Sequence, residues 1–265
     1  MKVSLLLIVA LLLCQCSFTQ NKPAQVEDAT KTATLEQHFE GQVQWIPGLN
    51  NTKFFSLYKP ATTSETLGKV LLLNQQDNRP NAPDVIGPLR RILPDDGWTT
   101  LTIEMPSKLE TGVNKTDDLT PARFNRINNG LEFFQDKPGN GVFVISYGRG
   151  AEHALKYLSH TQQSNILGLI LISGYSEKQS MTEQQWESFK RKHIPVLDLF
   201  VKDDNPKVLR DVNIRSEHYS SNNSLLYRRV ELQQIDKSYQ NSDDILVKGI
   251  NSWLHRKAAA VTKNS

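Results

Sequence analysis

The residues best placed to do chemistry follow a short apolar run in the middle of the chain. Val142–Ile145 leads into Ser146–Ala151 (SYGRGA) and then into a helix-like pattern, which predicts a strand, a tight turn and a helix. A turn of this kind can hold a nucleophilic side chain at its crest. The crest residue is Gly148, which has no side chain to attack a carbonyl. Glycine also relieves the backbone strain of about 1–3 kcal/mol that a side chain would bring to such a crest.

Two side chains are candidates for a hydrolytic reaction. Ser146 lies two residues before the crest, and Asp203 closely follows the predicted strand Val196–Val201. A serine nucleophile needs a base and a carboxylate that orients the base. Ser146 occupies the first small position of the turn, so we interpret it as a packing residue at the end of a strand. A rearranged catalytic arrangement that uses Ser146 and Asp203 is the alternative.

The backbone after the crest favours binding over hydrolysis. Arg149 and Gly150 lead into the N-terminus of the predicted helix, where free amides and the helix dipole attract an anion or a polarised carbonyl. Arg149 adds a cation, and amide side chains follow the apolar run Val70–Leu73. We expect a site for a small acidic or carbonyl-bearing ligand, formed by Tyr147, Gly148, Arg149, Gly150, Asn74 and Gln75. A turn that only packs is the alternative.

Short apolar runs alternate with helical patterns along the chain. This alternation predicts an α/β fold, a three-layer sandwich with about eight strands in a mostly parallel sheet and an antiparallel hairpin at the N-terminal end. The predicted strands are Gln42–Ile46, Phe54–Tyr58, Val70–Leu73, Trp98–Ile103, Val142–Ile145, Leu167–Ile172, Val196–Val201 and Tyr227–Ile235. The predicted helices are Asp84–Leu93, Thr120–Gln135, Gly150–Leu158, Met181–Lys192, Pro206–Tyr219 and Asp243–Arg256, with Thr120 and Asn205 as N-caps.

This order of elements resembles the α/β-hydrolase superfamily over about 40–256. Within that superfamily, the segment Asp96–Leu101 (DGWTTL) and the serine-free turn YGRGA are similar to an uncharacterised bacterial family of exported α/β-hydrolase-like proteins with a domain of unknown function. The superfamily orders its triad as nucleophile, acid and histidine. The resemblance places Gly148 in the nucleophile slot, Asp203 and Asp204 in the acid slot, and Asp236–Ser242, which contains no histidine, in the histidine slot.

The resemblance therefore implies an α/β-hydrolase fold with a degenerate triad and a ligand- or partner-binding role. An active serine hydrolase or esterase with a rearranged triad is one alternative. A structural or scaffold protein of the cell envelope is another.

The N-terminus predicts export. Lys2 precedes the apolar stretch Val3–Leu13, which matches a secretory signal and is shorter than the roughly 20 residues that span a bilayer. We expect a periplasmic or secreted protein with no transmembrane segment after cleavage. A lipoprotein is the alternative, although Cys14 and Cys16 do not follow small residues. The expected parts are a signal peptide (1–20), a flexible leader (21–39), one domain (40–256) and a tail (257–265).

Composition narrows the function classes further. Removal of Lys2 would leave 30 basic residues against 28 acidic ones, and a net charge of about +2 gives no reason to expect nucleic-acid binding. The mature chain would contain no cysteine, and its histidines lack metal-ligand spacing. His153 stands where a dinucleotide-binding fingerprint that begins at Gly148 needs its third glycine. We therefore expect no metal and no cofactor.

Overall fold

The computed structural model describes residues 33–74, 80–106, 119–162, 165–178, 181–220, 226–233, 235–239 and 243–262. The chain divides into two compact units, Met1–His38 and Phe39–Ser265. In the first unit, residues 33–38 are helical, inside the segment that the sequence predicts as a flexible leader. The predicted signal peptide and Gln75 lie outside the described residues.

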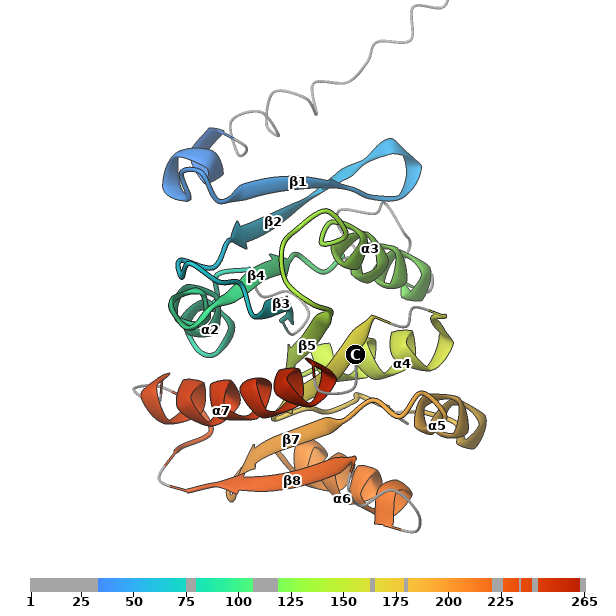
Figure 1. Cartoon of the computed structure of the whole chain (residues 1–265). Helices are drawn as coiled ribbons and strands as arrows, with labels where there is room; N and C mark the ends of the chain where they lie inside the picture. The colour runs from blue at the N-terminus through green and yellow to red at the C-terminus, as the bar shows by residue number, and fades with distance from the viewer. Residues whose placement is uncertain are drawn as a thin grey trace, which may run out of the picture. The chain divides into compact units, whose positions relative to one another are not determined.

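An eight-stranded sheet runs through the second unit (Figure 1), in the order β1-β2-β4-β3-β5-β6-β7-β8. β2 pairs antiparallel with β1 and with β4, and the other neighbouring strands are parallel. The predicted mostly parallel sheet with an antiparallel start is confirmed. The strands are β1 (Val43–Pro47), β2 (Lys53–Lys59), β3 (Gly68–Leu73), β4 (Trp98–Ile103), β5 (Val142–Tyr147), β6 (Ile166–Ile172), β7 (Val196–Val201) and β8 (Tyr227–Leu232).

Helices cover both faces of this sheet (Figure 1). Alternate residues of a strand point to opposite faces, and β5 shows the consequence. Val142 and Val144 pack in the cluster that contains α3, α4 and α5, whereas Phe143 and Ile145 pack in the cluster that contains α2 and α7. The helices are α2 (Ile86–Ile92), α3 (Thr120–Glu132), α4 (Gly150–His160), α5 (Glu183–Lys190), α6 (Pro206–Ser220) and α7 (Asp243–Thr262), with short 3-10 helices η1 (Leu49–Asn51) and η2 (Leu93–Asp96).

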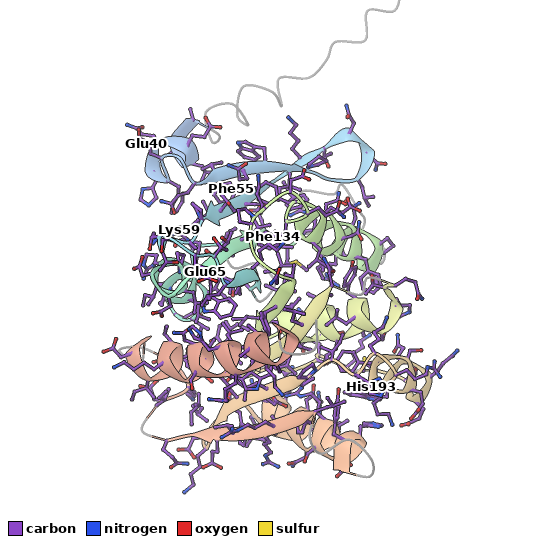
Figure 2. All side chains as sticks on the ribbon, in the orientation of Figure 1. Glu40, Phe55, Lys59, Glu65, Phe134 and His193 are labelled. Carbon is purple, nitrogen blue, oxygen red and sulfur yellow. The ribbon has the colours of Figure 1, made fainter. Side chains whose placement is uncertain are left out.

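Side chains fill the space between the helices and the sheet, and Phe134, labelled in Figure 2, is almost fully buried among them. On the other face, Trp98 of β4 is also fully buried and meets the Phe143 ring edge-on at 5.6 Å between centroids. A buried indole N–H needs an acceptor. Trp98 Nε1 donates to Asn251 Oδ1 at 2.7 Å, so this bond fixes α7 to the central strands.

The starts of α3 and α5 test two details of the prediction. α3 starts at Thr120 itself, because the preceding Leu119 already has helical dihedral angles and acts as the N-cap without a side-chain bond. The prediction of Thr120 as an N-cap is therefore wrong. α5 begins after Thr182, which forms a capping box with Gln185 and so defines the start of the helix.

The ends of α6 and α7 test two further predictions. Asn205 Oδ1 accepts from the Lys207 amide at 2.9 Å, so the predicted cap of α6 is confirmed. α7 continues to Thr262 instead of ending at Arg256. The three alanines after Lys257 have the highest helix propensity of any residue, which explains the extension. None of the helices in the described part of the chain is long and apolar enough to cross a bilayer.

Candidate functional site

The turn after β5 has glycine at its crest, in the left-handed conformation. Gly148 has φ 56°, which a side-chain-bearing residue adopts only with strain. Its amide donates to Ile172 O at 3.0 Å, and its carbonyl accepts from the Tyr175 amide at 3.2 Å. A Cβ on Gly150 would lie 2.8 Å from Leu73 O, so glycine allows α4 to start close against β3.

A pocket of about 440 Å³ lies beside Gly148. The carboxyl ends of parallel strands meet at one edge of a sheet, and the loops after β5, β6, β7 and β8 surround the pocket at that edge. Its volume is within the range of small-molecule sites. The lining residues are Tyr147, Gly148, Ser173, Tyr175, Asp203, Asp204, Asn205, Pro206, Val208 and Lys237. We call this the crest pocket.

The acid slot after β7 presents two carboxylates of different character. Asp203 is exposed and lines the crest pocket. Asp204 also lines it, but its oxygens accept hydrogen bonds from Ser173 Oγ, from the Val201 amide at 3.2 Å and from the Asn205 amide at 2.9 Å. These three donors hold the Asp204 carboxylate in one orientation in the wall of the pocket.

The histidine slot holds a tyrosine. Tyr239 is almost fully buried and has φ 56°. Its hydroxyl lies 2.7 Å from Ser173 Oγ, and its ring meets Tyr147 edge-on at 5.9 Å between centroids. Burial raises the pKa of the Tyr239 phenol above its usual value. The group in this slot is therefore protonated at neutral pH.

Ser173 joins the acid and histidine slots. It directly follows β6, lines the crest pocket and has φ 43°. Its hydroxyl donates to Asp204 and contacts Tyr239. Two non-glycine residues in the left-handed region, Ser173 and Tyr239, thus meet through their side chains. Strain of this kind persists only where the surrounding structure enforces it.

Buried charges on α6 hold the loop that carries Ser173 and Tyr175. Arg215 donates to both carboxylate oxygens of Asp198, at 2.6 and 3.1 Å, and to Gly174 O at 3.0 Å. Asp211 accepts from the Ser176 amide at 2.7 Å. Arg215, Asp198 and Asp211 are all almost fully buried, so the wall of the crest pocket is rigidly attached to α6.

The predicted site residues separate into three groups. Tyr147, Gly148 and Asp203 line the crest pocket. Gly150 and Asn74 are buried where α4 meets the end of β3. Arg149 is half-buried, and its Nε atom is buried without a hydrogen-bond partner.

Ser146 does not line the crest pocket. It is fully buried at the end of β5, and its Oγ donates to Ile170 O at 3.4 Å. Sequence reasoning missed Ser173 and Tyr239 as site residues. A serine directly after a continuous apolar strand is a signal for the first, because the carboxyl ends of such strands carry the site. For Tyr239, the signal is an aromatic residue in the segment where the resemblance places the missing histidine.

Within the described residues, no three His, Cys, Asp or Glu side chains are grouped closely enough to hold a metal ion. The described residues that line the crest pocket include no histidine. His153 is buried on α4, and His218 stacks on Trp186 at 4.5 Å between ring centroids.

A family model described as "Protein of unknown function (DUF3530)" matches residues 14–123 and 114–256 of the chain. No curated protein matches the sequence.

Solved structures with the same arrangement of elements include esterases. Est1E from Butyrivibrio proteoclasticus aligns with a TM-score of 0.65 at 10% identity, over 83% of this chain and 100% of Est1E. A dienelactone hydrolase from Anabaena variabilis aligns at 0.61 and 13% identity, over 81% and 98%. An esterase from Pyrococcus furiosus aligns at 0.64 and 13% identity, over 84% and 94%. These similarities establish the α/β-hydrolase fold.

Proposed function

The chain belongs to the DUF3530 family of proteins of unknown function and has the α/β-hydrolase fold, and from this premise we propose that it is an exported, non-catalytic member of that fold. Its triad is degenerate, and the crest pocket binds a small ligand. The fold supplies the pocket and the rigid loops around it. The residues in the triad slots favour binding over hydrolysis.

The main support for the proposal is the set of residues in the nucleophile, acid and histidine slots of the triad. Gly148 offers no nucleophile at the crest. A general base must be unprotonated near the operating pH, and burial raises the pKa of Tyr239 in the histidine slot. Asp204 is engaged by Ser173 and two backbone amides. With neither nucleophile nor base, the triad's contribution of about a millionfold in turnover is lost.

The crest pocket favours a small acidic or carbonyl-bearing ligand that also carries hydroxyl groups. The amide after the crest, on Arg149, is the donor that α/β hydrolases use to stabilise an oxyanion. Lys237 supplies a cation, and the exposed carboxylate of Asp203 supplies an acceptor for hydroxyl groups. The Tyr175 ring gives an apolar surface beside them.

The binding half of the proposal is tested by thermal unfolding of the mature protein with a panel of hydroxy- and keto-carboxylates. We expect at least one compound to raise the unfolding temperature of the parent and to lose that effect in Lys237→Glu. Lys248→Glu, at an exposed position of α7, is the matched control and should respond as the parent does. If no compound shifts the parent, or if the two variants respond alike, the crest pocket is not the binding site.

The catalytic half is tested with a serine-directed fluorophosphonate probe, which should not label the protein. Ser173 favours a second candidate function, an active serine hydrolase, because its hydroxyl lies in the pocket and is hydrogen-bonded to the Asp204 carboxylate. Stoichiometric labelling that Ser173→Ala abolishes would establish this second function. Labelling that Ser146→Ala abolishes would instead support the rearranged triad with Asp203.

A further inference from the structure

One face of α4 carries a partly buried stripe of polar side chains outside the crest pocket. Arg149, Glu152, His153 and Lys156 stand at positions i, i+3, i+4 and i+7, so they share a face of the helix. We call these four residues the α4 stripe. None of them lines the crest pocket, and the proposed function uses the backbone amide of Arg149 but none of these four side chains.

Within the part of the chain that the structure describes, three atoms of the α4 stripe are buried with no hydrogen-bond partner. They are Arg149 Nε, Glu152 Oε2 and His153 Nε2, and His153 is only 3% exposed. Polar atoms in protein interiors are almost always hydrogen-bonded to protein or to ordered water. Three such atoms on adjacent turns of one helix therefore mark a place where bound water or a ligand would complete their hydrogen bonds.

The charges around His153 define what that molecule can be. Burial, together with the cations Arg123, Arg149 and Lys156, lowers the pKa of His153 to about 3, so the imidazole is neutral and can donate one N–H. Arg149 Nε is a donor under all conditions. Two donors at the N-terminal end of a helix, in a cationic environment, suit the oxygens of an anion.

Glu152 adds a requirement for a proton on the ligand. Its Oε1 atom is paired with Lys156 Nζ at 2.8 Å, which leaves Oε2 as a free acceptor. An ionised carboxylate is acceptor-only, so it repels a fully ionised anion and accepts a hydrogen bond from one that carries O–H. Lys156 also lines a pocket of about 310 Å³ between α3, α4 and α5, so this pocket lies beside the Lys156 end of the stripe.

We propose that the α4 stripe binds an oxyanion that carries an O–H group. Arg149 and His153 donate hydrogen bonds to its oxygens, and Glu152 accepts a hydrogen bond from its O–H group. Hydrogenphosphate and small hydroxycarboxylates share this chemistry. Sulfate and acetate are the matched anions that lack the O–H.

Isothermal titration of the mature protein at pH 7 with these four anions tests the proposal, with glycolate as the hydroxycarboxylate. We expect phosphate to bind about tenfold or more tightly than sulfate, or glycolate to exceed acetate by that ratio. The pair that shows the difference identifies the ligand class. Binding of none of the four anions, or equal binding within both pairs, would overturn the proposal.

Variants of the stripe separate a binding role from a structural one. Glu152→Gln should raise sulfate or acetate affinity toward that of the protonated partner, because an amide can donate where the carboxylate cannot. Arg149→Gln should weaken the favoured anion by about tenfold, whereas the exposed Lys248→Gln should not. If Glu152→Gln does not fold, Arg149→Lys still tests the stripe, because it keeps the charge and removes the Nε donor.

The crest-pocket variant Lys237→Glu distinguishes this proposal from the proposed function. It should leave anion binding at the α4 stripe unchanged. Loss of phosphate or glycolate binding in Lys237→Glu, with no loss in Arg149→Gln, would place the anion in the crest pocket and overturn the assignment to the stripe.

Discussion

The first prediction at the scale of residues concerns the effect of Gly148 on stability. Its φ of 56° is costly for a side-chain-bearing residue, so Gly148→Ala should lower the free energy of unfolding by about 1–2 kcal/mol. Gly249 is the matched control, since it lies exposed within α7 with no atom near an added Cβ. Gly249→Ala should raise the free energy of unfolding by about 0.5–1 kcal/mol. Urea denaturation of both variants measures the difference, and two effects of the same sign would contradict it.

The second prediction concerns His153 and the pH dependence of the free energy of unfolding. Its pKa falls from the usual 6.5 to about 3 in the folded protein, so below pH 6.5 the unfolded state binds a proton that the folded state does not. The stabilisation from a neutral His153 is present above pH 6.5 and is lost at about 1.4 kcal/mol per pH unit as the pH falls toward 3.

His153→Gln removes this titration and keeps a polar side chain of similar size. The parent should lose about 2 kcal/mol more stability than His153→Gln between pH 7 and pH 5. Denaturant unfolding at the two pH values measures this, and carboxylates contribute equally to both proteins. Parallel pH profiles for the parent and His153→Gln would show that the imidazole is not held neutral.

At the scale of residues, part of the site followed from the sequence. The positions of Gly148, Tyr147 and Asp203 could be predicted, because the turn and the acid slot are defined by short local patterns beside apolar strands. The contact between Ser173 and Tyr239 could not, because it joins residues 66 apart in the chain. Arg149 was expected beside the crest, but its side-chain Nε is buried, and the direction of that side chain depends on the packing of α4.

At the scale of elements, the attachment of α6 to the loop after β6 gives the third prediction. Arg215→Ala would leave the fully buried Asp198 carboxylate without its bidentate partner. Breaking a buried pair in this way costs about 3–5 kcal/mol. Arg228, exposed on β8, is the control, and Arg228→Ala should change stability by less than about 0.5 kcal/mol. Urea denaturation measures both, and a small effect of Arg215→Ala would mean that water reaches Asp198.

Elements were easier to predict than their ends. The alternation of apolar strands and helices predicted all eight strands in their order along the chain, because the hydrophobic period of each segment is a local property. The ends depend on single hydrogen bonds, such as the capping box of Thr182 and Gln185. Buried ion pairs such as Arg215 and Asp198 could not be predicted, because sequence patterns do not show which charged side chains point into the core.

At the scale of the whole molecule, the order of the strands brings distant loops together. β3 lies between β4 and β5 in the sheet, so the chain reverses direction across the sheet beside the crest turn. Ligands bind where the order of a parallel sheet changes in this way. The crest pocket is therefore a product of topology, and four separate loops contribute to it.

Export is the remaining property of the whole molecule, and the separation of the two units makes it testable. The unit that contains the sheet begins at Phe39, so removal of the expected signal peptide (1–20) would remove no strand of the sheet. Expressed with its own N-terminus in a bacterium, the protein should be recovered from the periplasm with an intact mass that lacks the signal peptide.

Leu7→Arg interrupts the apolar stretch and should leave an uncleaved precursor in the cell, because the secretory signal needs a continuous apolar region. Gln25→Arg, in the polar segment after the signal, adds the same charge and should be processed normally. An unprocessed parent, or a Leu7→Arg variant processed as efficiently as Gln25→Arg, would rule out a cleaved signal peptide and with it the proposed export by this route.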